Sequence, residues 1–292
     1  MSLQSIYNSS QAACDAINEL KPRGHSFSDI TPNYQHERSL MRDLFRRCSV
    51  AFEQSNESVL LFRGSHGADE SLQYIKPAAS PRGSRDNWNV WNLLFDHNIK
   101  GQSIPPRSTS IMASGKREVA SEYGPISIVL PVGNPYIAYC QNDFSDAYYE
   151  LKVESVTRDM IRPLRIKPSI KTFIIESLNE GTSTAQVMKA LRVLSHVVAK
   201  EPPEEIINRL DFSLRNLPNK AVMIQCIKNK RLIDFYIGMM MPSRVKISTQ
   251  RFSELNANTL KVQGECWLNA PCFVMDDDRF FEYQKIFNNI KK

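Results

Sequence analysis

The sequence lacks the long apolar runs from which membrane and secreted proteins are recognised. No stretch of its 292 residues approaches the ~20 consecutive apolar residues that span a bilayer. The first residues, Met1 to Ser5, show no basic flank followed by an apolar run, which is the pattern of a secretory signal. We therefore expect a soluble, cytoplasmic protein without membrane contact.

Paired metal-binding or disulfide-forming cysteines are also missing. The six cysteines, at positions 14, 48, 140, 226, 266 and 272, form no CxxC pair, and no histidine lies close enough to complete a zinc site. Cys266 and Cys272 are the nearest pair, and on one strand they would be too far apart to bridge. The sequence predicts free, mostly buried thiols in a reducing compartment and no bound metal.

The common nucleotide and hydrolase motifs are absent as well. There is no GxxxxGK[ST] and no GxGxxG, so neither a P-loop nor a Rossmann fingerprint is present. HExxH is missing, and no GxSxG is followed by plausible catalytic partners. These absences exclude the best-known sequence routes to phosphate, dinucleotide and ester chemistry.

What the sequence does contain is an ordinary globular composition. With 42% hydrophobic and 23% charged residues, it can bury a core as one large domain or two small ones. The net charge of +6 is mildly basic and comes without a tight Lys/Arg tract. Aromatic and basic residues around Trp88 and Trp91 (Arg82 and Arg85) could stack on bases, but nucleic acid is the less favoured partner.

Hydrophobic periodicity divides the chain into an α+β arrangement. Helices are expected at 36–54, 88–95, 115–123 and through most of 158–217; strands are expected at 58–62, 108–112, 126–131, 136–139, 221–227, 231–237, 244–248 and 260–275. We predict an N-terminal helical segment (1–57), the first half of a mixed-sheet core (58–157), a helical insertion (158–220) and the second half of the core (221–292).

The first candidate for chemistry is Arg63, where the apolar strand 58–62 ends. Its planar guanidinium suits a pair of phosphates, and the following Gly64 allows a ligand to approach the backbone closely. Taken alone, Arg63 is more often a surface-turn arginine.

Two further candidates follow along the chain. Ser108-Thr109-Ser110 offers three hydroxyls that can bond a ribose, a phosphate or a carboxylate, although hydroxyl-rich strand edges are common. Gln263 and Glu265 alternate on one side of a late strand with Gly264 between them. A carboxylate there is unfavourable unless it is exposed or used, and an edge strand with a solvated Glu is the plain alternative.

In this order the three pieces resemble the Arg-Ser-Glu class of mono-ADP-ribosyltransferases. Phe62-Arg63-Gly64 is similar to the aromatic-Arg-Gly of that family, Ser108-Thr109-Ser110 to its Ser-Thr-Ser, and Gln263-Gly264-Glu265 to its Gln-x-Glu. The likeness covers about a third of the chain. The Ser and Glu motifs lie farther apart here than in compact members, so residues from about 140 to 245 have to form an inserted module.

The resemblance implies an ADP-ribosyltransferase-like core that uses NAD as a substrate and a protein as acceptor. It implies that Glu265 stabilises the oxocarbenium-like ribose, that Arg63 holds the pyrophosphate and that Gly64 contacts the nicotinamide amide. Ser108, Thr109 and Ser110 line the NAD site in this reading, with Ser108 and Ser110 positioning the nicotinamide ribose and the Glu. Gln263 faces the acceptor, with arginine the less favoured acceptor.

Two alternatives stay open. Glu150, in the segment Tyr148 to Glu154, is nearer in sequence to Ser110 and is a rival for the site carboxylate. The protein could also be a non-enzymatic structural or interaction protein, because a fold does not settle activity. The overall pattern, including Gly264-Glu265-Cys266-Trp267, is loosely similar to bacteriophage-encoded proteins. That likeness suggests virion or host-protein partners and a place in the virion or host cytoplasm.

Overall fold

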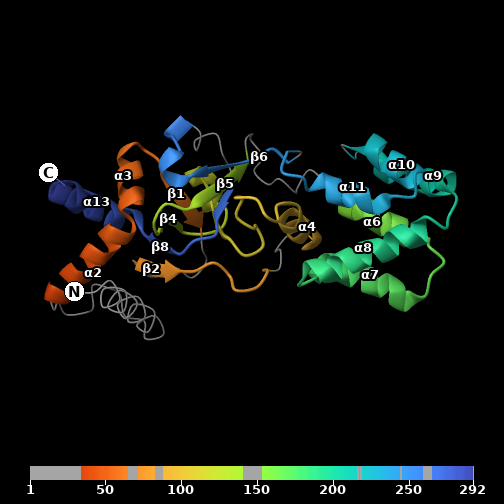
Figure 1. Ribbon diagram of the computed structural model, residues 1–292, viewed down its shortest axis with the longest axis horizontal. Coiled ribbons are helices and arrows are strands. Elements are labelled where there is room, and N and C mark those ends of the chain that lie inside the picture. The colour runs from red at the N-terminus through yellow and green to blue at the C-terminus, as the bar shows by residue number, and fades with distance from the viewer. Residues whose placement is uncertain are drawn as a thin grey trace. The chain divides into compact units, whose positions relative to one another are not determined.

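The computed structural model describes residues 34–64, 72–82, 88–140, 153–215, 217, 219–243, 245–258 and 265–291. The expected α+β class is confirmed (Figure 1). The chain divides into two compact units, which we call the strand unit (1–77, 110–145 and 249–292) and the helical unit (78–109 and 146–248). Each unit is thus assembled from segments that are distant in sequence.

The strand unit contains two four-stranded sheets. The first has the order β1–β4–β8–β2, formed by Leu61–Gly64, Ile126–Pro131, Cys272–Met275 and Leu72–Ile75. The second has the order β3–β7–β5–β6, formed by Ile111–Ala113, Cys266–Leu268, Tyr136–Cys140 and Ile247–Arg251. An isolated antiparallel bridge between Phe62 and Ser114 links β1 to the end of β3.

The expectation of one mixed sheet is wrong, because the described strands form two antiparallel sheets. The reason lies in the connections. β7 and β8 are separated by a short link, Asn269 to Pro271, and yet belong to different sheets; β4 and β5 likewise change sheet across Val132 to Pro135. Chains that cross between two sheets at such corners need no helical crossover, which parallel neighbours would require.

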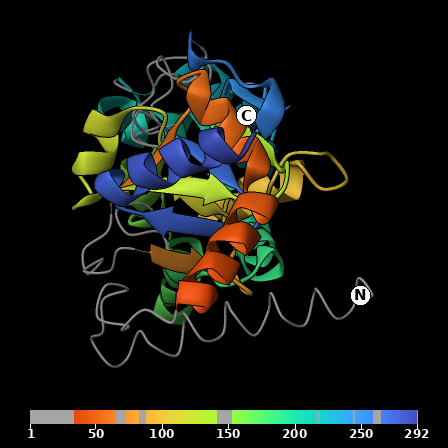
Figure 2. The same ribbon diagram turned by 90° about the vertical axis from the view of Figure 1, so that its left-hand side faces the viewer.

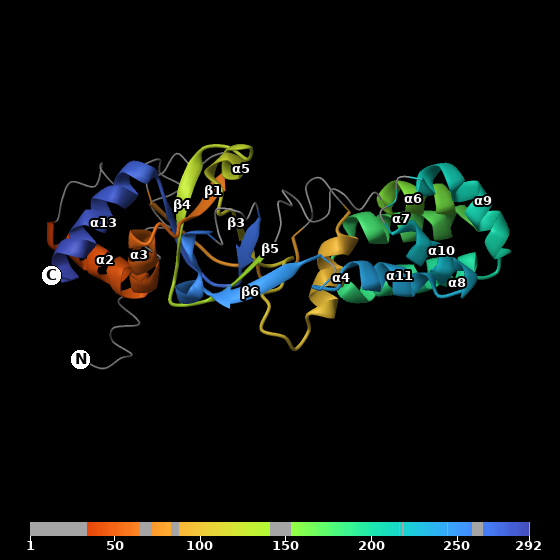
Figure 3. The ribbon, with the colours of Figure 1, turned by 90° about the horizontal axis from the view of Figure 1, so that it is seen from above.

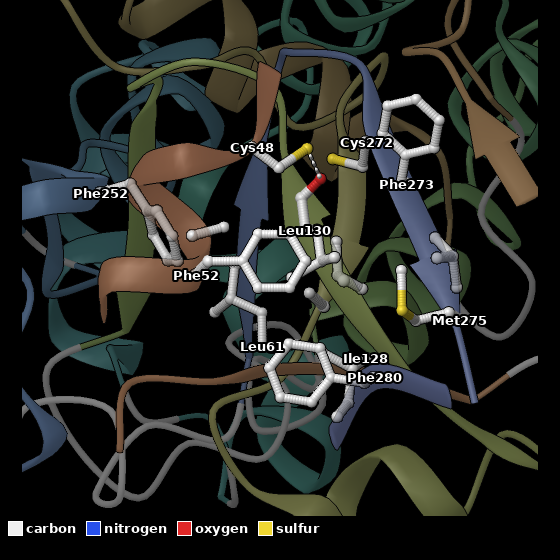
Figure 4. Packing of buried hydrophobic residues seen from close by; sticks show 14 of the residues in the cluster. Cys48, Phe52, Leu61, Ile128, Leu130, Phe252, Cys272, Phe273, Met275 and Phe280 are labelled. Carbon is white, nitrogen blue, oxygen red and sulfur yellow. Dashed lines mark hydrogen bonds between the residues drawn. The ribbon is translucent and has the colours of Figure 1, made fainter. Parts of the chain in front are cut away.

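Helices α2 (Tyr34–Arg47), α3 (Ser49–Asn56) and α13 (Asp277–Lys291) pack on the first sheet, as Figure 2 shows across β4 and β8. Phe52 of α3 stacks on Phe280 of α13 with ring centroids 5.9 Å apart. In Figure 4 these rings lie over Leu130 and Ile128 of β4. Burying a side chain such as Phe52, which is fully enclosed, contributes roughly 1.5–3 kcal/mol. This aromatic layer anchors the sheet that carries Arg63.

The helical unit is built from α4 and the consecutive helices α6 to α11 (Figure 3). Their bounds are Val90–Asn98 (α4), Val153–Ile161 (α6), Pro168–Glu180 (α7), Thr184–Val198 (α8), Pro203–Leu214 (α9), Lys220–Lys228 (α10) and Leu232–Met239 (α11). Ser183 caps α8 by accepting a hydrogen bond from the backbone of Gln186. The apolar face of α8 is buried at Val187, Leu191, Leu194 and Val198.

Several expected elements are wrong. The segments 221–227 and 231–237, expected as strands, are the helices α10 and α11. Their apolar runs are short, and such runs do not distinguish a strand from a buried helix. The expected helix 36–54 is broken at Cys48 into α2 and α3. Strand β2 and the remaining shorter elements, α5 (Arg117–Ser121) and the 3-10 turn Phe252–Glu254, complete the described part.

The unit boundaries therefore differ from the expected domains. The helical unit extends beyond 158–220, taking in 78–109 and continuing through α11 to Ser248. Because α4 contacts α8 and α11, the segment around Trp88 packs with helices that follow it by about a hundred residues. None of the described helices is both long and apolar enough to cross a membrane.

Candidate functional site

Arg63 lies on β1 and faces the interior of the strand unit. It alternates with Leu61, which is fully buried, so both side chains leave the strand on the core side. Its Nη1 donates to the carbonyl oxygen of Met112 at 3.0 Å. Burial lowers the pKa of Arg63, and the Cys272 thiol opposes that shift. No described carboxylate forms an ion pair with this guanidinium, so it is a largely buried cation with one protein acceptor.

Gly64 ends the same strand and has a structural reason to be glycine. An ideal Cβ at this position would lie 2.0 Å from the carbonyl oxygen of Ala120 and 3.0 Å from the backbone nitrogen of Gly124. Both atoms belong to the end of α5 and the turn after it. A side chain at residue 64 is therefore excluded by α5, independently of any ligand.

Ser108 and Thr109 belong to the helical unit and lie in a turn; strand β3 begins only at Ile111. Asp96 of α4 accepts hydrogen bonds from the backbone nitrogens of Arg107 (2.6 Å) and Ser108 (3.2 Å), and from the Ser108 side chain. The pKa of Asp96 is raised because burial disfavours its charged form, although these hydrogen bonds act in the opposite direction. Ser108 is thus buried and bonded to Asp96.

Ser110 belongs to the strand unit and directly precedes β3. Strand β7 pairs with β3. In the β3–β7 register Ala113 is opposite Cys266. Continued by one residue, this register would place Glu265 opposite Ser114; the Glu265 carbonyl accepts a hydrogen bond from the Cys140 nitrogen of β5 at 3.4 Å. Ser110 lies four residues away along β3, roughly 13 Å at ~3.3 Å per residue. β7 thus folds back onto β3, the strand that follows Ser110, but Glu265 lies just before β7, at the end of this pair that is farther from Ser110.

The same register fixes the face from which each side chain leaves. Phe62 is opposite Ser114 in an isolated bridge, and the β3–β7 register continued by one residue places Ser114 opposite Glu265; we infer that these three side chains project from one face of β1, β3 and β7. Arg63, one residue on from Phe62, projects from the other face, together with Ala113 of the core. β1 and β7 both lie next to β3, and by this inference the side chains of Arg63 and Glu265 project from opposite faces.

The remaining sequence candidates are accounted for as follows. Gln263, Gly264, Glu150 and Arg85 lie outside the described residues. Among the residues that the structure describes, no group of His, Cys, Asp and Glu is arranged to hold a metal ion. All five described cysteines are free thiols, which confirms that prediction for this part of the chain.

The aromatic residues proposed to stack on bases are core residues. Trp88 and Trp91 are each 2% exposed. Glu154 of α6 accepts from the Trp88 backbone at 2.6 Å and from the Trp91 indole at 3.1 Å. Trp91 also stacks on Tyr236 of α11, with ring centroids 6.2 Å apart. Neither indole has a face available to a nucleic-acid base.

Sequence reasoning missed Asp96 and Glu154, the two carboxylates that organise the helical unit. A signal for Asp96 was present. Asn92 and Asp96 are spaced four apart and enclose the apolar run Leu93 to Phe95, and polar groups at such buried positions need partners. Asn92 bonds the Arg107 guanidinium through its side-chain oxygen, next to the bonds that Asp96 makes. For Glu154 no comparable local signal exists, because its partners lie more than sixty residues earlier.

Comparison with known proteins identifies no relative. No protein-family model matches the chain, and neither a curated protein nor a solved structure is significantly similar to it.

Proposed function

We propose that this protein is a mono-ADP-ribosyltransferase-like protein that transfers ADP-ribose from NAD to a protein acceptor. The observation that carries the proposal is the state of Arg63. Buried charges are ordinarily paired, because leaving them uncompensated is costly. Arg63 is largely buried, contacts one carbonyl oxygen and has no carboxylate partner among the described residues. A guanidinium in this state suits an anionic ligand such as a pyrophosphate.

The strand arrangement gives further support. The proposal requires the segments that bear Arg63, Ser110 and Glu265 to be neighbours although they are up to two hundred residues apart. β1 joins β3 at the Phe62–Ser114 bridge, and β3 pairs with β7. All three segments therefore meet within the strand unit.

The reaction balances without a further co-reactant. The bond between the nicotinamide nitrogen and ribose C1′ breaks, and nicotinamide leaves with the bonding electrons as a neutral molecule. A nucleophilic atom of the acceptor forms the new bond to C1′ and loses its proton. Glu265 would hold a ribose hydroxyl and stabilise the positive charge that develops on the sugar. Arg63 would hold the pyrophosphate.

The test uses the full chain, NAD labelled in its adenylate, and cell-extract proteins as acceptors. Nicotinamide release and label transfer are measured for wild type, Glu265→Gln and the matched control Glu282→Gln, whose carboxylate is exposed on α13. We expect Glu265→Gln to lower transfer by about 10²–10³-fold and the control to retain it. If wild type neither consumes NAD nor transfers label, or if Glu265→Gln transfers as well as wild type, the proposal fails.

A second candidate is a non-enzymatic structural or interaction protein, such as a virus-particle component with a degenerate transferase fold. The point in its favour is the inferred register, which puts Arg63 and Glu265 on opposite faces of β1, β3 and β7. Detection of the chain in purified particles, together with no NAD turnover by the isolated protein, would select this candidate. Turnover that depends on Glu265 would reject it.

A further inference from the structure

The positive charge of the protein is concentrated in the helical unit. The segments 78–109 and 146–248 contain 21 Lys and Arg against 13 Asp and Glu, whereas the strand unit contains 16 against 18. The mild net charge of +6 is thus the sum of a strongly basic helical unit and a slightly acidic strand unit. Such an excess attracts anionic partners to one part of a molecule.

Within this unit, several cations gather at one end of a helical hairpin. α7 and α8 are joined by three residues, Gly181 to Ser183, and such short links make neighbouring helices antiparallel. Contact along the pair agrees, since the Lys189 ammonium lies 5.7 Å from the Phe173 ring. The start of α7 therefore lies beside the end of α8. The exposed cations at that end, which we call the basic hairpin end, are Arg162, Arg165, Lys167, Arg192 and Lys200.

These cations are not neutralised by the described part of the protein. None of the five forms an ion pair with a described carboxylate. The acids nearest in sequence are engaged elsewhere: Asp159 accepts from the Ser213 hydroxyl, and Glu201 lies 3.8 Å from Arg209. By contrast, Arg209 on α9 and Arg215 directly after it each pair with an acid four residues earlier, at 2.8 Å.

The surface chemistry favours a nucleic acid over an acidic protein. Protein interfaces usually centre on aromatic and other apolar side chains and are poor in lysine. Over the described residues 154–200, no large hydrophobic side chain is exposed. Contacts to a nucleic-acid backbone are polar and strongly positive, and arginine matches phosphate geometry. Because residues 154–200 expose no aromatic side chain that could stack on unpaired bases, a duplex suits this surface better than a single strand; the exposed Phe212 lies on α9, outside it.

We propose that the basic hairpin end binds the phosphate backbone of duplex nucleic acid without reading its sequence. This function is independent of NAD chemistry in the strand unit. It also differs from base stacking by Trp88 and Trp91, which the core excludes.

The experiment measures binding of the full chain to a fluorescently labelled 20-bp DNA duplex by anisotropy over a KCl series. The test variant is Arg165→Gln/Lys167→Gln/Arg192→Gln, and the control, Arg209→Gln/Arg215→Gln/Lys228→Gln, removes the same charge from paired positions. Each phosphate contact contributes about 0.9 to the slope of log K against log salt, so the test variant should lose about 2.7. Near 0.1 M salt this corresponds to a weakening on the order of 10²-fold, and the control should retain most of the affinity.

Other arms decide what the surface binds. A second variant, Arg162→Gln/Lys200→Gln, should reduce the slope of log K against log salt by about 1.8. It tests the same proposal if the first variant misfolds. Two duplexes of unrelated sequence should bind equally. The proposal is overturned if wild type does not bind at 50 mM salt, if test and control variants lose affinity equally, or if a polyglutamate peptide or a single strand binds more tightly than the duplex.

Discussion

The packing of α5 on β1 can be tested by giving Gly64 a side chain. A Cβ there would lie 2.0 Å from the Ala120 carbonyl oxygen, whereas ordinary contacts begin near 3.4 Å. The end of α5 would have to retreat by more than an ångström, because a backbone atom cannot rotate away. Overpacking costs about 1–3 kcal/mol, and we expect Gly64→Ala to reach the upper end. With about 2–4 °C per kcal/mol for a protein of this size, the melting temperature should fall by about 6–12 °C.

The assay measures thermal unfolding by calorimetry, and Gly238→Ala is the comparison variant. Gly238 lies in α11 and an added Cβ meets nothing within 4 Å. Alanine is favoured over glycine inside a helix by roughly 0.5–1 kcal/mol, so the same substitution should raise stability there. A Gly64→Ala protein that melts within a degree of wild type would refute the described packing of α5. It would also free Gly64 for the ligand contact that the sequence resemblance implies.

Four further changes are expected. Because burial raises the pKa of Asp96, the folded state holds this proton more tightly than an unfolded chain does, with its pKa of about 3.9. Stability should therefore fall as pH rises from about 4 through the folded pKa, and urea titrations of Asp96→Asn should lack this component. Ser183→Ala should cost about 1 kcal/mol by removing the α8 cap, measured by circular dichroism. Phe52→Ala should cost about 3–5 kcal/mol in urea unfolding. Burial raises the pKa of Cys266, so mass spectrometry should show the partly exposed Cys226 alkylated first.

The elements that could be predicted from sequence are those with local signals at both ends. The strand Ile126–Pro131 is apolar except for Ser127, is preceded by Gly124 in a left-handed conformation and is closed by a proline. Helix α8 has a cap at Ser183 and an apolar face at helical spacing. In both cases the residues that start and stop the element are within it or beside it, and distant contacts are not needed to define it.

The elements that could not be predicted depend on distant partners. β2 is four residues long, and it is a strand because Leu72–Ile75 pairs with β8, two hundred residues later. α11 carries its buried residues at 232, 235, 236 and 239, which is helical spacing, but eight residues are too few to distinguish it from a strand by apolar content alone. For the candidate site, the sequence indicated that Arg63 ends a strand. It could not indicate the β3–β7 register, in which Ala113 is opposite Cys266, the residue after Glu265.

This inferred register places Arg63 and Glu265 on opposite faces, whereas the proposed transfer reaction needs both side chains at one NAD molecule. A one-residue shift of β1 against β3 would move Arg63 to the face of Glu265, but it would also turn Leu61 out of the core, at a cost of about 1.5–3 kcal/mol. It would break the four-residue pairing of β1 with β4 as well. Binding of an anion at Arg63 does not require Glu265, whereas transfer of ADP-ribose requires both side chains to reach one ligand. If the protein binds pyrophosphate through Arg63 but releases no nicotinamide from NAD, the non-enzymatic candidate is therefore supported, with an anion-binding site at Arg63.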